Sequence, residues 1–268
     1  IPHKAWYSVD GQIPWAIASE SGQCDLLLIS FLGIDFLSQG NRYYRLTDYT
    51  MTFMDELPKE GDTLRYEIQI KSFMKSGDAW AFYFGYDCYV REKLVYKMTG
   101  GRAGFSSMEE LAQGKGVVIS KMEEQERKAI PKQQFQPLLV CSKLKFDRTD
   151  LLNVTRGNIS SCFGSHYDQR GKNPSLRFAS EEMLMLDRIV SLDPQGGPWG
   201  LGEVIAEKGL APDDWYFPCH FKDDNVLAGT LITEGCVQLL GFYMLYLGLQ
   251  IKTGDARFQP IQNRPYSI

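Results

Sequence analysis

The sequence predicts an α+β fold in which long apolar helices pack against an antiparallel sheet. Two segments, 15–37 and 229–248, are apolar on most of their faces, as expected of helices that a sheet encloses. The second segment is long enough for about five helical turns. After the first segment, apolar and polar residues alternate along the chain. This alternation is typical of half-buried antiparallel strands.

The first predicted helix covers residues 15–37. Pro14 precedes it and Gly40 follows it, as is common at helix ends. Gly22 and Gly33 lie inside the segment and lower its helix propensity. We therefore expect close backbone packing to compensate at these glycines.

Strands are predicted in three segments after this helix, over 42–54, 63–74 and 79–98. The alternation is clearest in the second segment, where polar residues separate Tyr66, Ile68 and Ile70. The third segment is long enough to fold back on itself, with residues 91–93 at its tip. The three segments are therefore expected to form an antiparallel meander that follows the first helix.

The chain is expected to comprise a first domain (1–105), a connector (106–182) and a second domain (183–268). The connector is more polar than its neighbours and lies, on this interpretation, on the two domains without forming a third. Its short helical segments are 108–113, 121–128 and 147–154.

The second domain is predicted to begin with two strands, 183–190 and 201–208. An aromatic strand at 215–217 and a polar loop follow, and then the helix 229–248. Residues 251–268 begin a further extended stretch.

Composition excludes several classes of function. The formal net charge of −4 and the pI near 5.5 argue against nucleic acid as a partner. Six cysteines form no CxxC pair and no metal-like spacing with the three histidines, so we expect free thiols in a reducing cytoplasm and neither metal nor cofactor. The longest apolar runs contain Asp25 or Glu234, so no membrane span is expected.

A polar loop in the second domain contains His220. The helix after it begins at Gly229 and has Glu234 in its second turn. A lone histidine is more often structural than catalytic, but here a base, a helix N-terminus and a carboxylate occur together. These groups can move a proton next to a carbonyl, which favours catalysis. For Glu234, and for Glu20 in the first helix, a buried structural network is the alternative.

The spacing of this loop resembles that of a known family. His220, Asp224, Gly229 and a glutamate 14 positions after the histidine resemble the active-site loop and central helix of β-hydroxyacyl thioester dehydratases. Those enzymes have the hotdog fold, in which an antiparallel sheet wraps a long helix. The resemblance departs at Asn225 and Ala228, where single-domain relatives usually have prolines.

Flanking segments extend the resemblance, which is dense from 183 to about 250 and thinner over 1–105. The segments that carry it are 183–189, 202–203, 206–208, 212–215 and 238–243. Together they most resemble the dehydratase region of bacterial polyunsaturated fatty acid synthases. That region is itself similar to the β-hydroxydecanoyl thioester dehydratase family.

The two domains contain copies of one pattern. A Trp-Tyr pair at 6–7, a proline and an apolar helix parallel the Trp-Tyr pair at 215–216, a glycine and an apolar helix. The first copy is shorter and lacks the histidine. The first domain is therefore expected to be a pseudo-catalytic hotdog unit, and the second the catalytic unit, in a double hotdog or a dimer.

The resemblance implies a role for each candidate residue, with base and acid from opposite units. His220 would take the Cα proton, and a protonated Glu20 would donate a proton to the departing hydroxyl. Backbone N–H groups of Gly229 and Thr230 would polarise the thioester carbonyl. Glu234 is the alternative acid.

The choice between the two acids depends on the register of the two helices. If Gln23 is aligned with Gln238, the acid position in the first helix falls on Ser19. In that register Glu20 loses its role and Glu234 takes it.

The resemblance also implies a reaction and its partners. Such an enzyme dehydrates β-hydroxyacyl thioesters, carried on the phosphopantetheine of an acyl carrier protein, to trans-2-enoyl thioesters. The same groups can isomerise a 2-trans double bond to 3-cis. The alternatives are a hotdog acyl thioesterase, in which a carboxylate activates water, and a non-catalytic module that docks the carrier or a neighbouring domain.

Each predicted unit lacks strands. The first has no strands before its helix, and the second has few after its helix, so the open edges of its hairpin would invite other strands. We therefore expect the chain to be a segment of a larger multidomain synthase. The missing strands should come from another chain, or the two units should share one continuous sheet.

Overall fold

The structure is a computed structural model that describes residues 1–23, 33–116, 118–221 and 223–267. The backbone divides into two compact units that exchange short segments. Unit 1 comprises Ile1–Ala5, Gly11–Gly116 and Gln259–Ile268, and unit 2 comprises Trp6–Asp10 and Val117–Phe258. Residues 6–10 thus belong to the same unit as the loop that contains His220.

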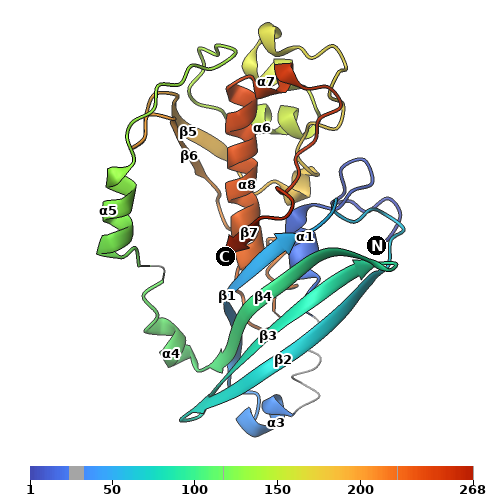
Figure 1. The fold of residues 1–268 in the computed structure, drawn as a ribbon, viewed down its shortest axis with the longest axis vertical. Helices are drawn as coiled ribbons and strands as arrows, with labels where there is room; N and C mark the ends of the chain where they lie inside the picture. Colours follow the sequence, from blue (N-terminus) through green and yellow to red (C-terminus); the bar gives the residue numbers. More distant parts are fainter. Residues whose placement is uncertain (24–32, 117, 222, 268) are drawn as a thin grey trace. The chain divides into compact units, whose positions relative to one another are not determined.

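Unit 1 contains a five-stranded antiparallel sheet of order β2-β3-β4-β1-β7 (Figure 1). Its strands are β1 (Tyr43–Phe53), β2 (Leu64–Ser76), β3 (Ala79–Val90), β4 (Lys93–Ser106) and β7 (Pro265–Ser267). The three predicted strand segments are confirmed, and the third folds back at residues 91–92. The short strand β7 pairs with β1 over Thr50–Thr52, so the end of the described chain completes the sheet of unit 1.

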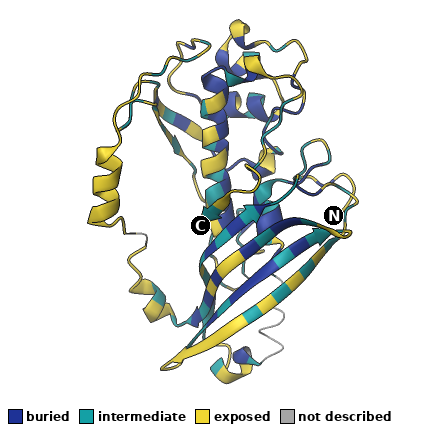
Figure 2. Ribbon diagram, in the orientation of Figure 1, coloured by how far each residue is buried: buried dark blue, intermediate teal, exposed yellow. Residues whose placement is uncertain are grey.

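The core of unit 1 lies on one face of this sheet, where β3 and β4 contribute the fully buried side chains of Phe82, Cys88 and Tyr96. The outer strand β2 is exposed along most of its length (Figure 2). Because the described sheet ends at β2, the polar residues that alternate along it face solvent, as the sequence pattern predicts.

The predicted helix 15–37 is not continuous. The structure has α1 (Trp15–Glu20), a turn at 21–23 and α3 (Ile34–Ser38); residues 24–32 lie outside the described residues. The helix ends because the Ser21 hydroxyl donates to the carbonyl oxygen of Ala18, at 2.9 Å, in competition with the helical pattern. Close packing is confirmed at Gly22, where a methyl group would lie 2.3 Å from the Tyr86 ring, but not at Gly33, where it would meet no described atom within 4 Å.

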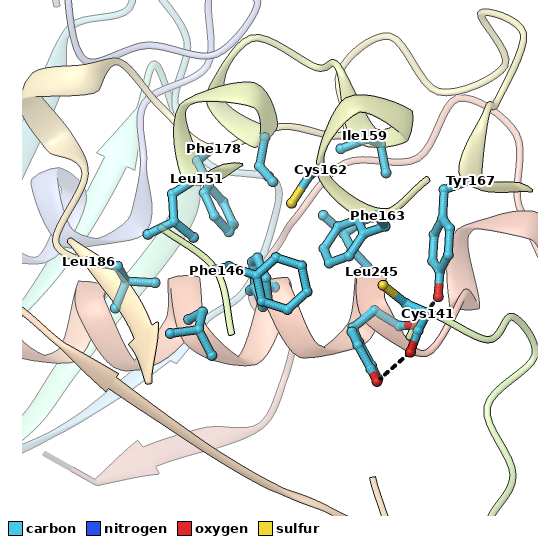
Figure 3. Close-up of a cluster of buried hydrophobic side chains, with 14 of the residues drawn as sticks. Cys141, Phe146, Leu151, Ile159, Cys162, Phe163, Tyr167, Phe178, Leu186 and Leu245 are labelled. Atoms are coloured by element: carbon cyan, nitrogen blue, oxygen red, sulfur yellow. Dashed lines mark hydrogen bonds between the residues drawn. The ribbon is translucent and has the colours of Figure 1, made fainter. Parts of the chain in front are cut away.

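Unit 2 is organised around the long apolar helix α8 (Gly229–Tyr246). Helices α6 (Arg148–Thr155) and α7 (Ile159–Phe163) supply much of the surrounding core (Figure 3). The ring of Phe242 on α8 packs 4.9 Å from Phe146 and 5.0 Å from Phe163, measured between ring centroids. Aromatic contacts of this kind fix the orientation of the helix in its core.

The helices expected between 106 and 182 are all present. Capping boxes begin α4 (Met108–Ala112), α5 (Lys121–Ala129) and α6, so local sequence alone specifies their N-termini. Helices α4 and α5 bury no residue, whereas residues from 141 to 178 contribute to the core of unit 2. The pseudo-catalytic and catalytic roles of domains 1–105 and 183–268 stay predictions.

The strands of unit 2 are shorter than predicted. β5 (Arg188–Asp193) pairs with β6 (Glu203–Glu207) in a separate two-stranded sheet. Residues before Arg188 contain the 3-10 turn η2 (Glu181–Met183) instead of a strand, because their backbone bonds to a side chain of α8.

One further expectation is wrong for the described part of the chain: residues 215–217 form consecutive turns instead of a strand. Of the expectation that the two predicted units share one sheet, the structure has one part, because β7, from the predicted second unit, pairs with β1 of the first. β5 and β6 form a separate sheet, with a further bridge between Ile189 and Phe146. The alternative, that another chain supplies strands, stays a prediction.

Candidate active site

Helix α8 begins at Gly229 without a side-chain cap. Its N-cap residue, Ala228, has no polar side chain, and the first N–H groups of any helix lack partners within that helix. A methyl group at Gly229 would meet no described atom within 4 Å, so the space beside this first residue is open. Thr230, the next residue, is buried. The N-terminus thus offers a site where partial negative charge on an oxygen would be stabilised.

A run of tight turns before α8 contains His220. Asp214 organises the start of this run, because its carboxylate accepts hydrogen bonds from the backbone N–H of Ala211 and from the hydroxyl of Tyr216. The bond from Tyr216 holds the pKa of Asp214 below its usual value. Burial, together with the Asp214 carboxylate, raises the pKa of Tyr216. Both shifts preserve the charged acceptor and the neutral donor, which stabilises the turn at neutral pH.

The imidazole of His220 is directed by a contact with the backbone. Its Nδ1 lies 3.4 Å from the carbonyl oxygen of Val226, two residues before the N-cap of α8. A carbonyl oxygen only accepts, so this contact favours the tautomer with hydrogen on Nδ1. Nε2 is then the nitrogen that can accept a proton.

The loop around the histidine is closed by a pair of backbone hydrogen bonds. The N–H of Phe221 donates to the oxygen of Asp224, and the N–H of Asp224 donates to the oxygen of Phe221, both at 3.0 Å. The Phe221 ring also stacks on the imidazole of His220, with 4.1 Å between centroids. These contacts restrict the imidazole without any proline at Asn225 or Ala228.

Glu234 is buried on α8, with 5% of its surface exposed, and it is held by an amide. Gln238 Nε2 donates to Glu234 Oε1 at 2.9 Å and to the carbonyl oxygen of Met183 at 2.8 Å. The backbone N–H of Met185 donates to Gln238 Oε1 at 2.9 Å. Gln238 therefore joins the acid on α8 to the backbone of residues 183–185.

The same backbone segment is joined to the histidine loop. The indole N–H of Trp215 donates to the carbonyl oxygen of Glu182 at 2.9 Å. Residues 182–185 thus bond to Trp215 on one side and to Gln238 on the other. Unit 2 consequently brings Glu234, Gly229 and Thr230 together on one helix and fixes the histidine loop to the segment that supports this helix.

Glu20, the other candidate acid, is the last residue of α1 in unit 1. The amide of Gln23 donates to its carboxylate. Ser19, the alternative acid position, is buried and its hydroxyl lies 3.1 Å from the hydroxyl of Tyr49. Burial raises the pKa of Tyr49, while its hydrogen bond with Ser19 acts in the opposite direction.

Sequence reasoning missed the role of Gln238. From the sequence alone, this residue contributes only to the family resemblance and to the register of the two helices. No hydrogen-bonding role is assigned to Gln238 from the sequence. A buried amide on an otherwise apolar helix, one turn after a carboxylate, is the signal that could have identified it.

The described residues contain no group of three or more histidine, cysteine, aspartate or glutamate side chains that could hold a metal ion. Within the same residues, no helix has the length and apolar character needed to cross a membrane.

Comparison with known sequences finds a family model that matches the segment containing this site. The model of the FabA-like domain matches residues 178–267, which include the His220 loop and all of α8. Over its whole length, across 273 aligned residues, the chain is 41% identical to a polyunsaturated fatty acid synthase subunit from Thraustochytrium sp. (strain ATCC 26185 / S-3). The chain spans 18% of the length of that protein.

Comparison with solved structures gives weaker likenesses. The 12:0-ACP thioesterase from Umbellularia californica is 11% identical over 55% of this chain and 62% of its own, with a TM-score of 0.29. A MaoC-like dehydratase is 11% identical over 76% of this chain and 55% of its own, with a TM-score of 0.26. At these scores the likeness is too weak to assign a function.

The sequence comparisons confirm the resemblance to the polyunsaturated fatty acid synthase dehydratase region. With the antiparallel sheet of unit 1 and the apolar helix of unit 2, they also confirm the α+β hotdog class. Residues 178–267 match the model of the FabA-like domain, within a chain that is similar along its whole length to a region of a polyunsaturated fatty acid synthase subunit.

Proposed function

We propose that the chain removes water from β-hydroxyacyl thioesters carried by an acyl carrier protein and forms trans-2-enoyl thioesters in polyunsaturated fatty acid synthesis. The observation that carries this proposal is the position of His220. Its Nδ1 contact with Val226 favours Nε2 as the proton acceptor, and the loop that contains it leads into α8 at Gly229, where a methyl group would meet no described atom within 4 Å.

In the first step, Nε2 of His220 takes the proton from Cα of the substrate. The electrons of that C–H bond move toward the thioester carbonyl, whose oxygen gains negative charge. Backbone N–H groups of Gly229 and Thr230 stabilise this charge, together with the dipole of α8. The helix is suited to this task because its N-cap residue supplies no side-chain cap.

In the second step, the Cβ–O bond breaks and an acid protonates the departing hydroxyl, so that water leaves and a Cα–Cβ double bond forms. We assign this proton to Glu20, with Glu234 as the alternative. The Gln23–Glu20 bond supports the assignment, because an amide holds Glu20 in unit 1 as Gln238 holds Glu234 in unit 2. Ser19, by contrast, is engaged with Tyr49.

The same groups can return a proton at a different carbon of the enoyl chain. Movement of the double bond from 2-trans to 3-cis would follow, and it needs no further residue. The carrier protein, the other domains of a synthase and a double-hotdog or dimeric assembly are the partners that the proposal implies.

Replacement of His220 tests the proposal. His220→Ala should abolish the conversion of β-hydroxyacyl thioester to enoyl thioester while circular dichroism stays unchanged, because a loop histidine contributes little to the core. The matched control is His166→Ala, which changes an exposed histidine in a short turn of unit 2. Turnover like that of the unsubstituted protein in His220→Ala would remove His220 from the mechanism.

A further inference from the structure

We propose that residues Trp6–Asp10, named here the N-terminal clamp, position the loop that carries His220. The clamp is separated from that loop by about two hundred residues of sequence, and nothing in the family resemblance assigns it a role. The inference deepens the proposed function and rests on it where catalytic rate is concerned.

The clamp belongs to unit 2, although the residues on both sides of it belong to unit 1. The chain therefore leaves one compact unit for five residues and then returns. Such an excursion costs conformational entropy unless contacts in the second unit offset it. Two contacts, one at each end of the clamp, act against this cost.

The first contact fixes the C-terminal end of the clamp. The carboxylate of Asp10 accepts a hydrogen bond from Arg177 Nη2 at 2.7 Å. A hydrogen bond from the side chain of Ser175 lowers the pKa of Asp10, and Arg177 lowers it further. Residues on both sides of Arg177, Leu176 and Phe178, are in the buried core of unit 2, so this end of the clamp is tied to a rigid element.

The second contact connects the clamp to the histidine loop. The Trp6 ring meets the Trp215 ring edge-on, with centroids 5.2 Å apart and an interplanar angle of 81°. Trp215 also bonds to Glu182 through its indole N–H. Trp215 is thereby held between the clamp and the segment that supports α8.

Trp215 is coupled to His220 through successive tight turns. The thiol of Cys219 donates to the carbonyl oxygen of Trp215 at 3.2 Å. The N–H of Cys219 donates to the oxygen of Tyr216, and the N–H of His220 lies 3.4 Å from the oxygen of Phe217. These bonds join the backbone of Trp215 to the backbone of His220, so a shift of the Trp215 backbone would also displace the turn that carries the histidine.

The clamp contributes little to the core itself. Trp6 remains 47% exposed, and none of residues 6–10 is among the buried cluster of unit 2. Its contact with Trp215 therefore bears on the position of the loop more than on the stability of the unit. The two Trp-Tyr pairs of the predicted repeat are therefore in contact through their tryptophans.

The test measures the reactivity of His220 directly. The chain has three histidines, so His3→Gln with His166→Gln leaves His220 as the sole histidine target of diethyl pyrocarbonate. In this background the rate of modification and its pH profile are measured for Trp6→Ala, Trp6→Phe and Asp10→Asn. Trp199→Ala is the matched control, since the indole of this half-buried tryptophan bonds to the backbone of Arg127, away from the histidine loop in sequence.

Trp6→Ala and Asp10→Asn should each change the modification rate of His220 several-fold, and Trp6→Phe, which keeps a ring against Trp215, should change it less. The kcat for dehydration should fall about tenfold in Trp6→Ala with KM little changed, on the scale of one aromatic contact. Trp199→Ala should alter neither quantity.

Unchanged reactivity of His220 in both Trp6→Ala and Asp10→Asn, with circular dichroism showing folded protein, would overturn the clamp. The two proposals fail separately. Altered reactivity in a chain that never dehydrates a thioester upholds the clamp and removes the proposed function. Normal dehydration together with unaltered reactivity of His220 in the clamp variants upholds the proposed function and removes the clamp.

Discussion

At the scale of single residues, both candidate acids accept a hydrogen bond from a glutamine amide, although Glu234 is buried and Glu20 only partly so. Gln238 donates to Glu234 one helical turn before it, and Gln23 donates to Glu20 three residues before it. The difference of one residue has a structural reason, because α1 ends in a tight turn at 21–23 while α8 continues. A sequence alignment without gaps cannot represent this difference, which is why it places Ser19 at the acid position.

The first prediction concerns the acid. If Glu20 donates the proton to the departing hydroxyl, Glu20→Gln should reduce the dehydration rate by at least about a hundredfold, which is the usual scale of general acid catalysis. Glu234→Gln should cost much less. Single-turnover rates with a β-hydroxyacyl thioester provide the comparison, and the opposite ranking would assign the acid to α8.

The second prediction concerns Gln238. Gln238→Leu replaces the amide with an apolar side chain of similar size. The carbonyl oxygen of Met183 and the N–H of Met185 then lose this partner. Each unsatisfied buried group should cost about 1–3 kcal/mol of unfolding free energy. Urea unfolding should show the loss. Gln195→Leu, at an exposed turn, is the control and should leave the unfolding midpoint unchanged. Equal midpoints for both variants would show that the Gln238 bonds do not stabilise unit 2.

At the scale of elements, local pattern and tertiary contact determine different parts of the fold. The strands of unit 1 follow the alternation of apolar and polar residues, and capping boxes mark the helices α4, α5 and α6. Both signals lie within a few residues of sequence, so sequence reasoning finds them.

The elements that sequence reasoning missed depend on distant partners. Residues 183–187 have the composition of a strand, but Gln238 takes their backbone bonds. Residues 215–217 are aromatic, as in many strands, but they form turns. Hydrogen bonds from Ala211 to the Asp214 carboxylate and from the Trp215 indole to Glu182 stabilise these turns. The candidate site residues were proposed from their spacing. The groups that contact them could not be identified in this way, because they come from other parts of the chain.

The third prediction belongs to α1. Gly22→Ala should destabilise unit 1 by about 1–3 kcal/mol, since the added methyl group would lie 2.3 Å from the Tyr86 ring and force the ring or the helix end to move. Thermal unfolding measures the effect. Gly254→Ala, where a methyl group meets nothing within 4 Å, should be close to neutral. A Gly22→Ala protein as stable as the control would show that the ring yields without cost.

At the scale of the whole molecule, the chain does not fold in two successive blocks. Residues 6–10 belong to unit 2, and the strand β7 near the end of the chain pairs with β1 in unit 1. Neither exchange is visible in composition or periodicity, because both depend on contacts between residues far apart in sequence. Such pairings are expected to form late in folding, since a long loop must close first.

The chain matches only 18% of its synthase relative, so its reaction has to be established on the chain itself. The most direct measurement is mass spectrometry of a carrier protein loaded with a β-hydroxyacyl thioester, before and after incubation with the protein. We predict loss of one water from the acyl chain, with the thioester intact, and no loss in His220→Ala. Release of free acid, or an unchanged acyl chain with the folded protein, would contradict the account.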